Sequence, residues 1–183
     1  MWKGFVKVAQ DLMPQALIVV DRFHVAGQLS DALDRYRRHL RREHPDVEEL
    51  KGIKWFLLKH KEELSQEDHD RLEAAFARVP QLEQCYLLKE TLRHWFDHFE
   101  DREEAEHFLA SWITQAQALE NRHLNRFLKT LTRWKDKILN YFESKISNGL
   151  VEGINHAIRQ IMRRAYGYSN FHHFRLRVLL ECR

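Results

Sequence analysis

Residues 15–21, QALIVVD, contain the only convincing buried-strand signal in the chain. Five consecutive apolar residues, rich in Val and Ile and bounded by polar residues, are typical of a buried β-strand. A single strand cannot satisfy its own backbone donors and acceptors. We therefore expect this strand either to pair with another chain, giving a homo-oligomer, or to be covered by the first helix. If it does neither, the rest of its sheet is missing from this chain.

Helical spacing dominates the rest of the chain, and it predicts a mainly α fold. A first helix precedes Pro14, which ends it. Gly52 weakens one later helix by about 1 kcal/mol. Ser65, Asp101 and Ser169 stand where N-cap residues are expected. The later helices are expected over residues 25–44, 47–61, 66–79, 81–99, 102–119, 121–142, 148–166 and 170–181.

Composition narrows the class of protein. The 183 residues suffice for one domain, or for one domain with a sub-domain. No apolar run approaches the roughly 18 residues of a membrane helix. The N-terminus has charges where a signal peptide has its apolar region. Two isolated cysteines, Cys85 and Cys182, indicate neither a disulfide framework nor a metal set, so a cytoplasmic protein is expected.

The net charge of +3 hides an uneven distribution. Residues 1–44 carry 8 Lys/Arg and 5 Asp/Glu, residues 45–110 carry 9 and 17, and residues 111–183 carry 13 and 5. A polyanionic partner should therefore contact the ends of the chain and avoid its middle. Solvated helix faces of uneven charge are the alternative explanation.

A lone carboxylate, Glu152, heads the basic helix expected from Asn148 onward. At about 100° per residue, Glu152 shares a face with amides and arginines, and apolar residues line the opposite face. Because the start of a helix favours negative charge, Glu152 is readily explained as a helix-start residue. The alternative is a Mg²⁺ ligand, since Mg²⁺ prefers carboxylate oxygens.

Asp21 ends the predicted strand, a common position for catalytic acids in α/β folds. It equally suits an N-cap leading into the next helix. We keep both interpretations, with Asp21 as a second candidate metal ligand.

Two blocks resemble DDE transposases of bacterial insertion sequences, in the ISL-three family. The first is "MWKGFVKVAQDLMPQALIVVDRFHVAGQLSDALDRYRR", and the second is "SNGLVEGINHAIRQIMRRAYGYSNFHHFRLRVLL". They resemble the family signatures "D-hydrophobic-W…P-x-A…VVDRFHV" and "NG-x-VEG-x-N…RRAYG-x-x-NF-x-x-FR-x-R". The similarity covers nearly the whole chain.

The resemblance implies a ribonuclease-H-like core in which three carboxylates hold two Mg²⁺ ions for DNA cleavage and strand transfer. It makes Glu152 the third carboxylate and places the first two aspartates before Met1. It further implies a core remnant over residues 1–25, an all-helical insertion over 26–143 and C-terminal core helices over 144–183. The expected fold is thus a mainly α helical bundle with one or few strands left from an incomplete core.

The resemblance also implies DNA as the partner and a nucleoid-associated location. The residues expected to contact DNA are Lys145, Asn148, Asn155, Arg159, Arg163, Arg164, Arg175 and Arg177. With one carboxylate of three, we expect the chain alone not to cleave DNA. Nicking of element-end DNA by the purified chain with Mg²⁺ or Mn²⁺, abolished by Glu152→Gln, would contradict this expectation. The alternative is a non-catalytic helical DNA-binding or dimerisation module.

Overall fold

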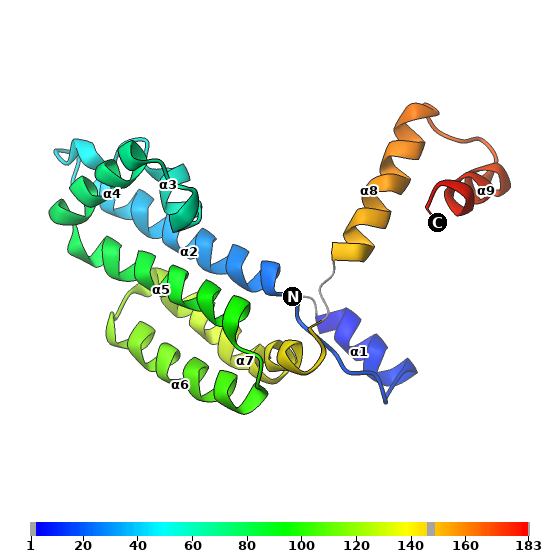
Figure 1. Ribbon diagram of the computed structural model, residues 1–183, viewed down its shortest axis with the longest axis horizontal. Helices are drawn as coiled ribbons and strands as arrows, with labels where there is room; N and C mark the ends of the chain where they lie inside the picture. Colours follow the sequence, from blue (N-terminus) through cyan, green and yellow to red (C-terminus); the bar gives the residue numbers. More distant parts are fainter. Residues whose placement is uncertain (1–2, 146–148, 183) are drawn as a thin grey trace. The chain divides into compact units, whose positions relative to one another are not determined.

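The computed structural model describes residues 3–145 and 149–182 and divides into two compact units, residues 1–145 and 146–183 (Figure 1). Of the side chains within those ranges, Lys3, Phe5, Leu150, Val151 and Glu152 lie outside the description. The first unit contains α1 (Lys3–Leu12), α2 (Arg22–Glu43), η1 (Glu48–Leu50), α3 (Lys54–Leu58), η2 (Lys61–Glu63), α4 (Gln66–Arg78), α5 (Pro80–His98), α6 (Arg102–Ala118) and α7 (Arg122–Ser144). The second contains α8 (Gly149–Arg164) and α9 (Phe171–Glu181). The mainly α fold is confirmed.

Helices α2, α5, α6 and α7 form an antiparallel four-helix bundle, in which each helix packs against two others (Figure 1). The pairing of α2 with α5 is marked by the ion pair of Arg22 with Asp97 at 2.6 Å. Lys135 of α7 lies 2.7 Å from Glu106 of α6. Short connections between α5, α6 and α7 favour this up-and-down arrangement of consecutive helices.

Two tryptophans anchor the core of the bundle. Trp95 of α5 is fully buried and donates from Nε1 to the Ala105 carbonyl at 3.0 Å. Trp112 of α6, 2% exposed, donates to the Leu88 carbonyl at 3.0 Å. Both indole N–H groups therefore have partners, as buried polar groups require. Each bond also joins α5 to α6.

One expected helix, over residues 47–61, is broken into short pieces. Gly52 has φ +76°, a left-handed conformation that ends helical structure between η1 and α3. The prediction that Gly52 only weakens this helix is wrong. The pieces pack with α4 across one end of the bundle.

The strand expected over residues 15–21 does not form, and the described residues contain no strand. Helix α7 supplies the backbone partners instead. Val20 N–H donates to the Lys137 carbonyl at 2.9 Å, and Asn140 Nδ2 donates to the Ile18 carbonyl at 2.8 Å. Val20 is buried against the bundle. An extended apolar segment is thus accommodated without a sheet.

Helix capping follows the sequence with one exception. Ser65 and Asp101 cap α4 and α6 as predicted, each through its side chain. Helix α9 is capped by Asn170, whose Oδ1 accepts from His172 N–H at 2.8 Å and from His173 N–H at 3.3 Å. The prediction of Ser169 is wrong because Gly167, at φ +101°, turns the chain so that Asn170 takes the cap position. No helix in the described ranges is long and apolar enough to cross a membrane.

Candidate nucleic-acid interface

Glu152 lies in the first turn of α8. Its side chain lies outside the described residues, as does the whole of Asn148. The helical backbone is consistent with both interpretations of Glu152, since a first-turn carboxylate also suits the helix dipole.

The predicted polar face of α8 is open to solvent. Asn155, His156, Arg159 and Arg163 are all exposed. Neither arginine pairs with a carboxylate among the described side chains. The opposite, apolar face is only partly covered, because Ile161 is buried whereas Ile154 and Met162 are exposed. Arg159 and Arg163, about two and three turns of helix beyond Glu152, are therefore available to a polyanion.

The α8–α9 corner engages two of the predicted DNA ligands. Arg164 and Arg177 both pair with Glu181 near the end of α9. The Arg164 guanidinium, and then Arg177, hold the pKa of Glu181 below its usual value. These two arginines line a hollow together with Ile161, Tyr168 and His173. Arg175 is exposed outside this ion-pair network.

Lys145 ends α7 in a left-handed conformation, φ 51°. Its ammonium donates to the Phe99 carbonyl and lies 5.1 Å from the Phe142 ring centroid. The side chain is exposed but already has local partners, so contact with DNA would compete with them.

Asp21 is the N-cap of α2, and its Oδ1 accepts from Phe23 N–H at 2.7 Å. The capping interpretation of Asp21 is thus observed, while the metal-ligand interpretation stays a prediction. No group of three His, Cys, Asp or Glu placed to hold a metal ion occurs among the side chains that the structure describes.

Sequence reasoning missed a basic groove between α2 and α7. Two hollows that share Arg35 make up this groove. The first is lined by Arg35, Arg37, Arg38, Arg41, Arg42 and His123, and the second by Arg35, Arg126 and Arg133 together with neighbouring polar and apolar side chains. Helical spacing could have revealed it, because Arg122, Arg126, Lys129 and Arg133 fall on one face of one helix. The cations of α2 give a weaker signal, because which of them share a groove with α7 depends on how the two helices pack.

Comparison with known proteins places the chain among transposases. The profile of a family described as Transposase, the ISL-three DDE type, matches residues 1–178. The chain is 31% identical over 171 residues to the transposase for insertion sequence element IS1001 of Bordetella parapertussis, an alignment covering 90% of this chain and 42% of that protein. It is 28% identical over 188 residues to the transposase for insertion sequence element IS1557 of Mycobacterium tuberculosis, covering 89% and 42%. The chain thus spans under half the length of these relatives. No solved structure matches it significantly.

Proposed function

Because the chain belongs to the DDE transposase family of the ISL-three type, whose profile matches residues 1–178, we propose that it takes part in DNA transposition. That match is the observation that carries the proposal. In this role, residues 1–25 and 144–183 belong to the catalytic core, and residues 26–143 form a helical insertion. The substrate is duplex DNA at the ends of an insertion sequence. Binding to chromosomal DNA would place the protein at the nucleoid.

Glu152 is the residue that we assign to catalysis. Its carboxylate would hold Mg²⁺, which when bound would supply charge stabilisation to the oxygens of a phosphodiester. A glutamate carboxylate is a hard oxygen donor of the kind that Mg²⁺ prefers. The described side chains supply no complete ligand set, and one oxygen of Asp21 already accepts from Phe23 N–H. The described side chains therefore account for only part of a two-metal ligand set.

The exposed arginines of α8 and α9 would position the DNA backbone. Arg159, Arg163 and Arg175 have no carboxylate partner among the described side chains, so binding phosphate breaks no ion pair of theirs. Arg164 and Arg177 would exchange Glu181 for a phosphate oxygen, which makes their contribution weaker. Guanidinium groups suit this task because they donate two parallel hydrogen bonds to phosphate.

A chimeric transposase tests the assignment of Glu152. This chain replaces the aligned part of the Bordetella parapertussis relative, 42% of that protein, and excision of a marked element with that relative's ends is counted in cells. We expect Glu152→Gln to reduce excision to background. Equal excision by the chimera with and without Glu152→Gln would refute the catalytic role and favour a non-catalytic DNA-binding or dimerisation module.

Glu67→Gln is the matched control in the same chimera. Glu67 is also a first-turn glutamate, in α4, and suits a helix dipole in the same way. If Glu152 acted only by its favourable interaction with the helix dipole, each substitution would lower the free energy of unfolding by about 0.3–1 kcal/mol. The two variants would then excise the element at the same rate. A loss of excision confined to Glu152→Gln separates chemistry from helix stability.

A further inference from the structure

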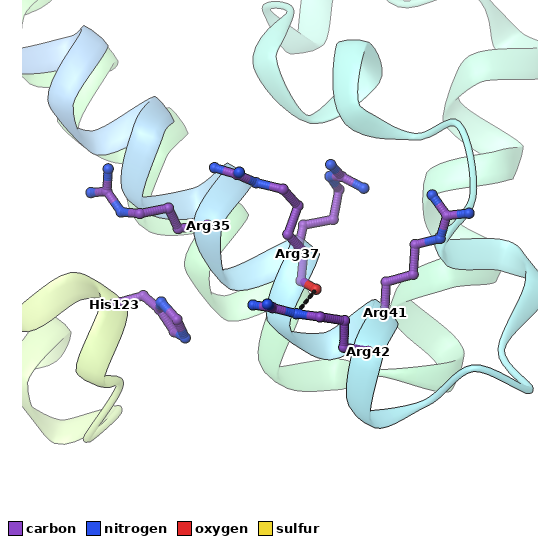
Figure 2. Close-up of a pocket in the computed structure, with 6 residues that line it drawn as sticks. Arg35, Arg37, Arg41, Arg42 and His123 are labelled. Atoms are coloured by element: carbon purple, nitrogen blue, oxygen red, sulfur yellow. Dashed lines mark hydrogen bonds between the residues drawn. The ribbon is translucent and has the colours of Figure 1, made fainter.

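Two rows of arginine face a common groove in the unit of residues 1–145. Helices α2 and α7 run antiparallel, since Arg122 at the start of α7 reaches His39 near the end of α2 at 3.1 Å. Arg35 of α2 and Arg126 and Arg133 of α7 line the same hollow. Figure 2 shows Arg35, Arg41 and Arg42 projecting from α2, with His123 of α7 nearby.

Helical periodicity explains why these cations gather. In α7, Arg122, Arg126, Lys129 and Arg133 are spaced i, i+4, i+7 and i+11, so they form one stripe. In α2, Arg35, Arg38 and Arg42 are spaced i, i+3 and i+7. The apolar stripe of α7 faces the core, which leaves its basic stripe at the surface. Of the α7 stripe, Arg126 and Arg133 line the groove opposite Arg35, so both walls carry positive charge, and Arg122 and Lys129 continue the stripe beside it.

Few carboxylates offset this charge. Asp34 pairs with Arg37 at 2.8 Å and with Arg38 at 3.2 Å. Asp31 also lines the groove. In contrast, Arg35, Arg41, Arg42, Arg126 and Arg133 have no carboxylate partner in the described part of the chain.

The pKa of His123 is lowered in part by the same excess of positive charge. Burial lowers the pKa of His123 first, and the nearby His39 and Arg122 lower it further. Arg35 and Arg42 act in the same direction. Burial and the neighbouring cations both disfavour the imidazolium of His123, and of these two causes only the positive charge would attract an anion.

We propose that the α2–α7 groove binds the phosphodiester backbone of duplex DNA, as a contact additional to the α8–α9 arginines. This inference rests on the proposed function, which makes DNA the partner. The stripe from Arg122 to Arg133 extends about 16 Å at 1.5 Å per residue. That length matches about five base-pair steps of 3.4 Å, so several phosphates fit along one wall. Backbone contacts of this kind position DNA without reading its sequence.

The test measures binding of the full chain to a fluorescent duplex of arbitrary sequence by anisotropy, over a series of salt concentrations. Arg35→Gln/Arg126→Gln removes one cation from each wall. Loss of two phosphate contacts should make the slope of log K against log salt shallower by about 1.8 and weaken binding by about tenfold or more. Far-UV circular dichroism confirms that the variant folds.

Two control variants make the result specific. Lys61→Gln/Arg78→Gln removes two exposed cations from the acidic middle of the chain, where neither has a carboxylate partner in the described residues. It should bind DNA as the unsubstituted chain does. Arg159→Gln/Arg163→Gln probes α8 separately and should lower the slope independently of the groove variant.

Three outcomes overturn the proposal. The first is a groove variant whose slope and affinity equal those of the Lys61/Arg78 control. The second is an unsubstituted chain that does not bind DNA. The third is a groove variant that loses binding to anionic phospholipid vesicles but not to DNA. None of them touches the excision test of Glu152, so failure of the groove and failure of the proposed function are distinguishable.

Discussion

Lys89 of α5 carries a buried ammonium that donates hydrogen bonds to the C-terminal end of α3. Replacing Lys89 tests how much these hydrogen bonds stabilise the fold. Its Nζ donates to the carbonyls of Leu57 and Lys59, each at 2.8 Å, and lies 2.6 Å from Glu90 Oε1. Those carbonyls lie at the C-terminus of α3, where helix carbonyls lack partners of their own. Burial lowers the pKa of Lys89, opposed mainly by Glu90. The ammonium is therefore desolvated but satisfied.

Lys89→Met keeps the length of the side chain and removes its charge. Each charge-assisted hydrogen bond contributes about 1.5–3 kcal/mol to the free energy of unfolding. Loss of the two bonds to the α3 carbonyls therefore removes about 3–6 kcal/mol. Part of this loss is offset, because methionine carries no charge that must be desolvated when the chain folds. Glu90 keeps a second partner, since Arg93 lies 3.2 Å from its Oε2. We expect a loss of about 3 kcal/mol in the free energy of unfolding.

The assay is urea unfolding followed by tryptophan fluorescence. All five tryptophans lie in residues 1–145, so the signal reports the unit that contains Lys89. Lys59→Met is the control, because its exposed ammonium is 3.8 Å from Asp68 and should contribute less than about 0.5 kcal/mol. If Lys89→Met unfolds within about 0.5 kcal/mol of the unsubstituted chain, the reasoning about the α3 carbonyls is wrong.

Two further predictions concern a thiol and a helix cap. Burial raises the pKa of Cys85 from 9.0 to about 11, with a hydrogen bond from Asn121 opposing the rise. The fold favours the protonated thiol, so its contribution to stability is full below pH 9.0 and is lost as the pH rises to about 11. The free energy of unfolding in urea should therefore fall by about 2–3 kcal/mol across this range. The Cys85→Ala variant should not show this fall. Asn170→Ala should cost α9 about 1 kcal/mol and speed amide hydrogen exchange of His173 about fivefold, whereas Ser169→Ala should leave it unchanged. Equal exchange rates in the two variants would contradict the assignment of the cap.

Helix positions were largely predictable, because the signals that set them are local. Ser65 and Asp101 start α4 and α6 where the sequence indicates. Local signals fail where two readings differ by one residue or where a turn decides the outcome. Asn170 rather than Ser169 caps α9, because after the left-handed turn at Gly167 it is the side chain of Asn170 that meets the free N–H groups.

The sequence by itself determined the helical class, the uneven charge and the position of Glu152 at the head of a basic helix. These depend on residue type and spacing along one segment. Tertiary structure alone decided what residues 15–21 do, because their backbone partners, Lys137 and Asn140, lie more than 110 residues away in the chain. It also decided that α2 and α7 bring their arginines to one groove, since helical spacing defines a face but only packing places two faces side by side.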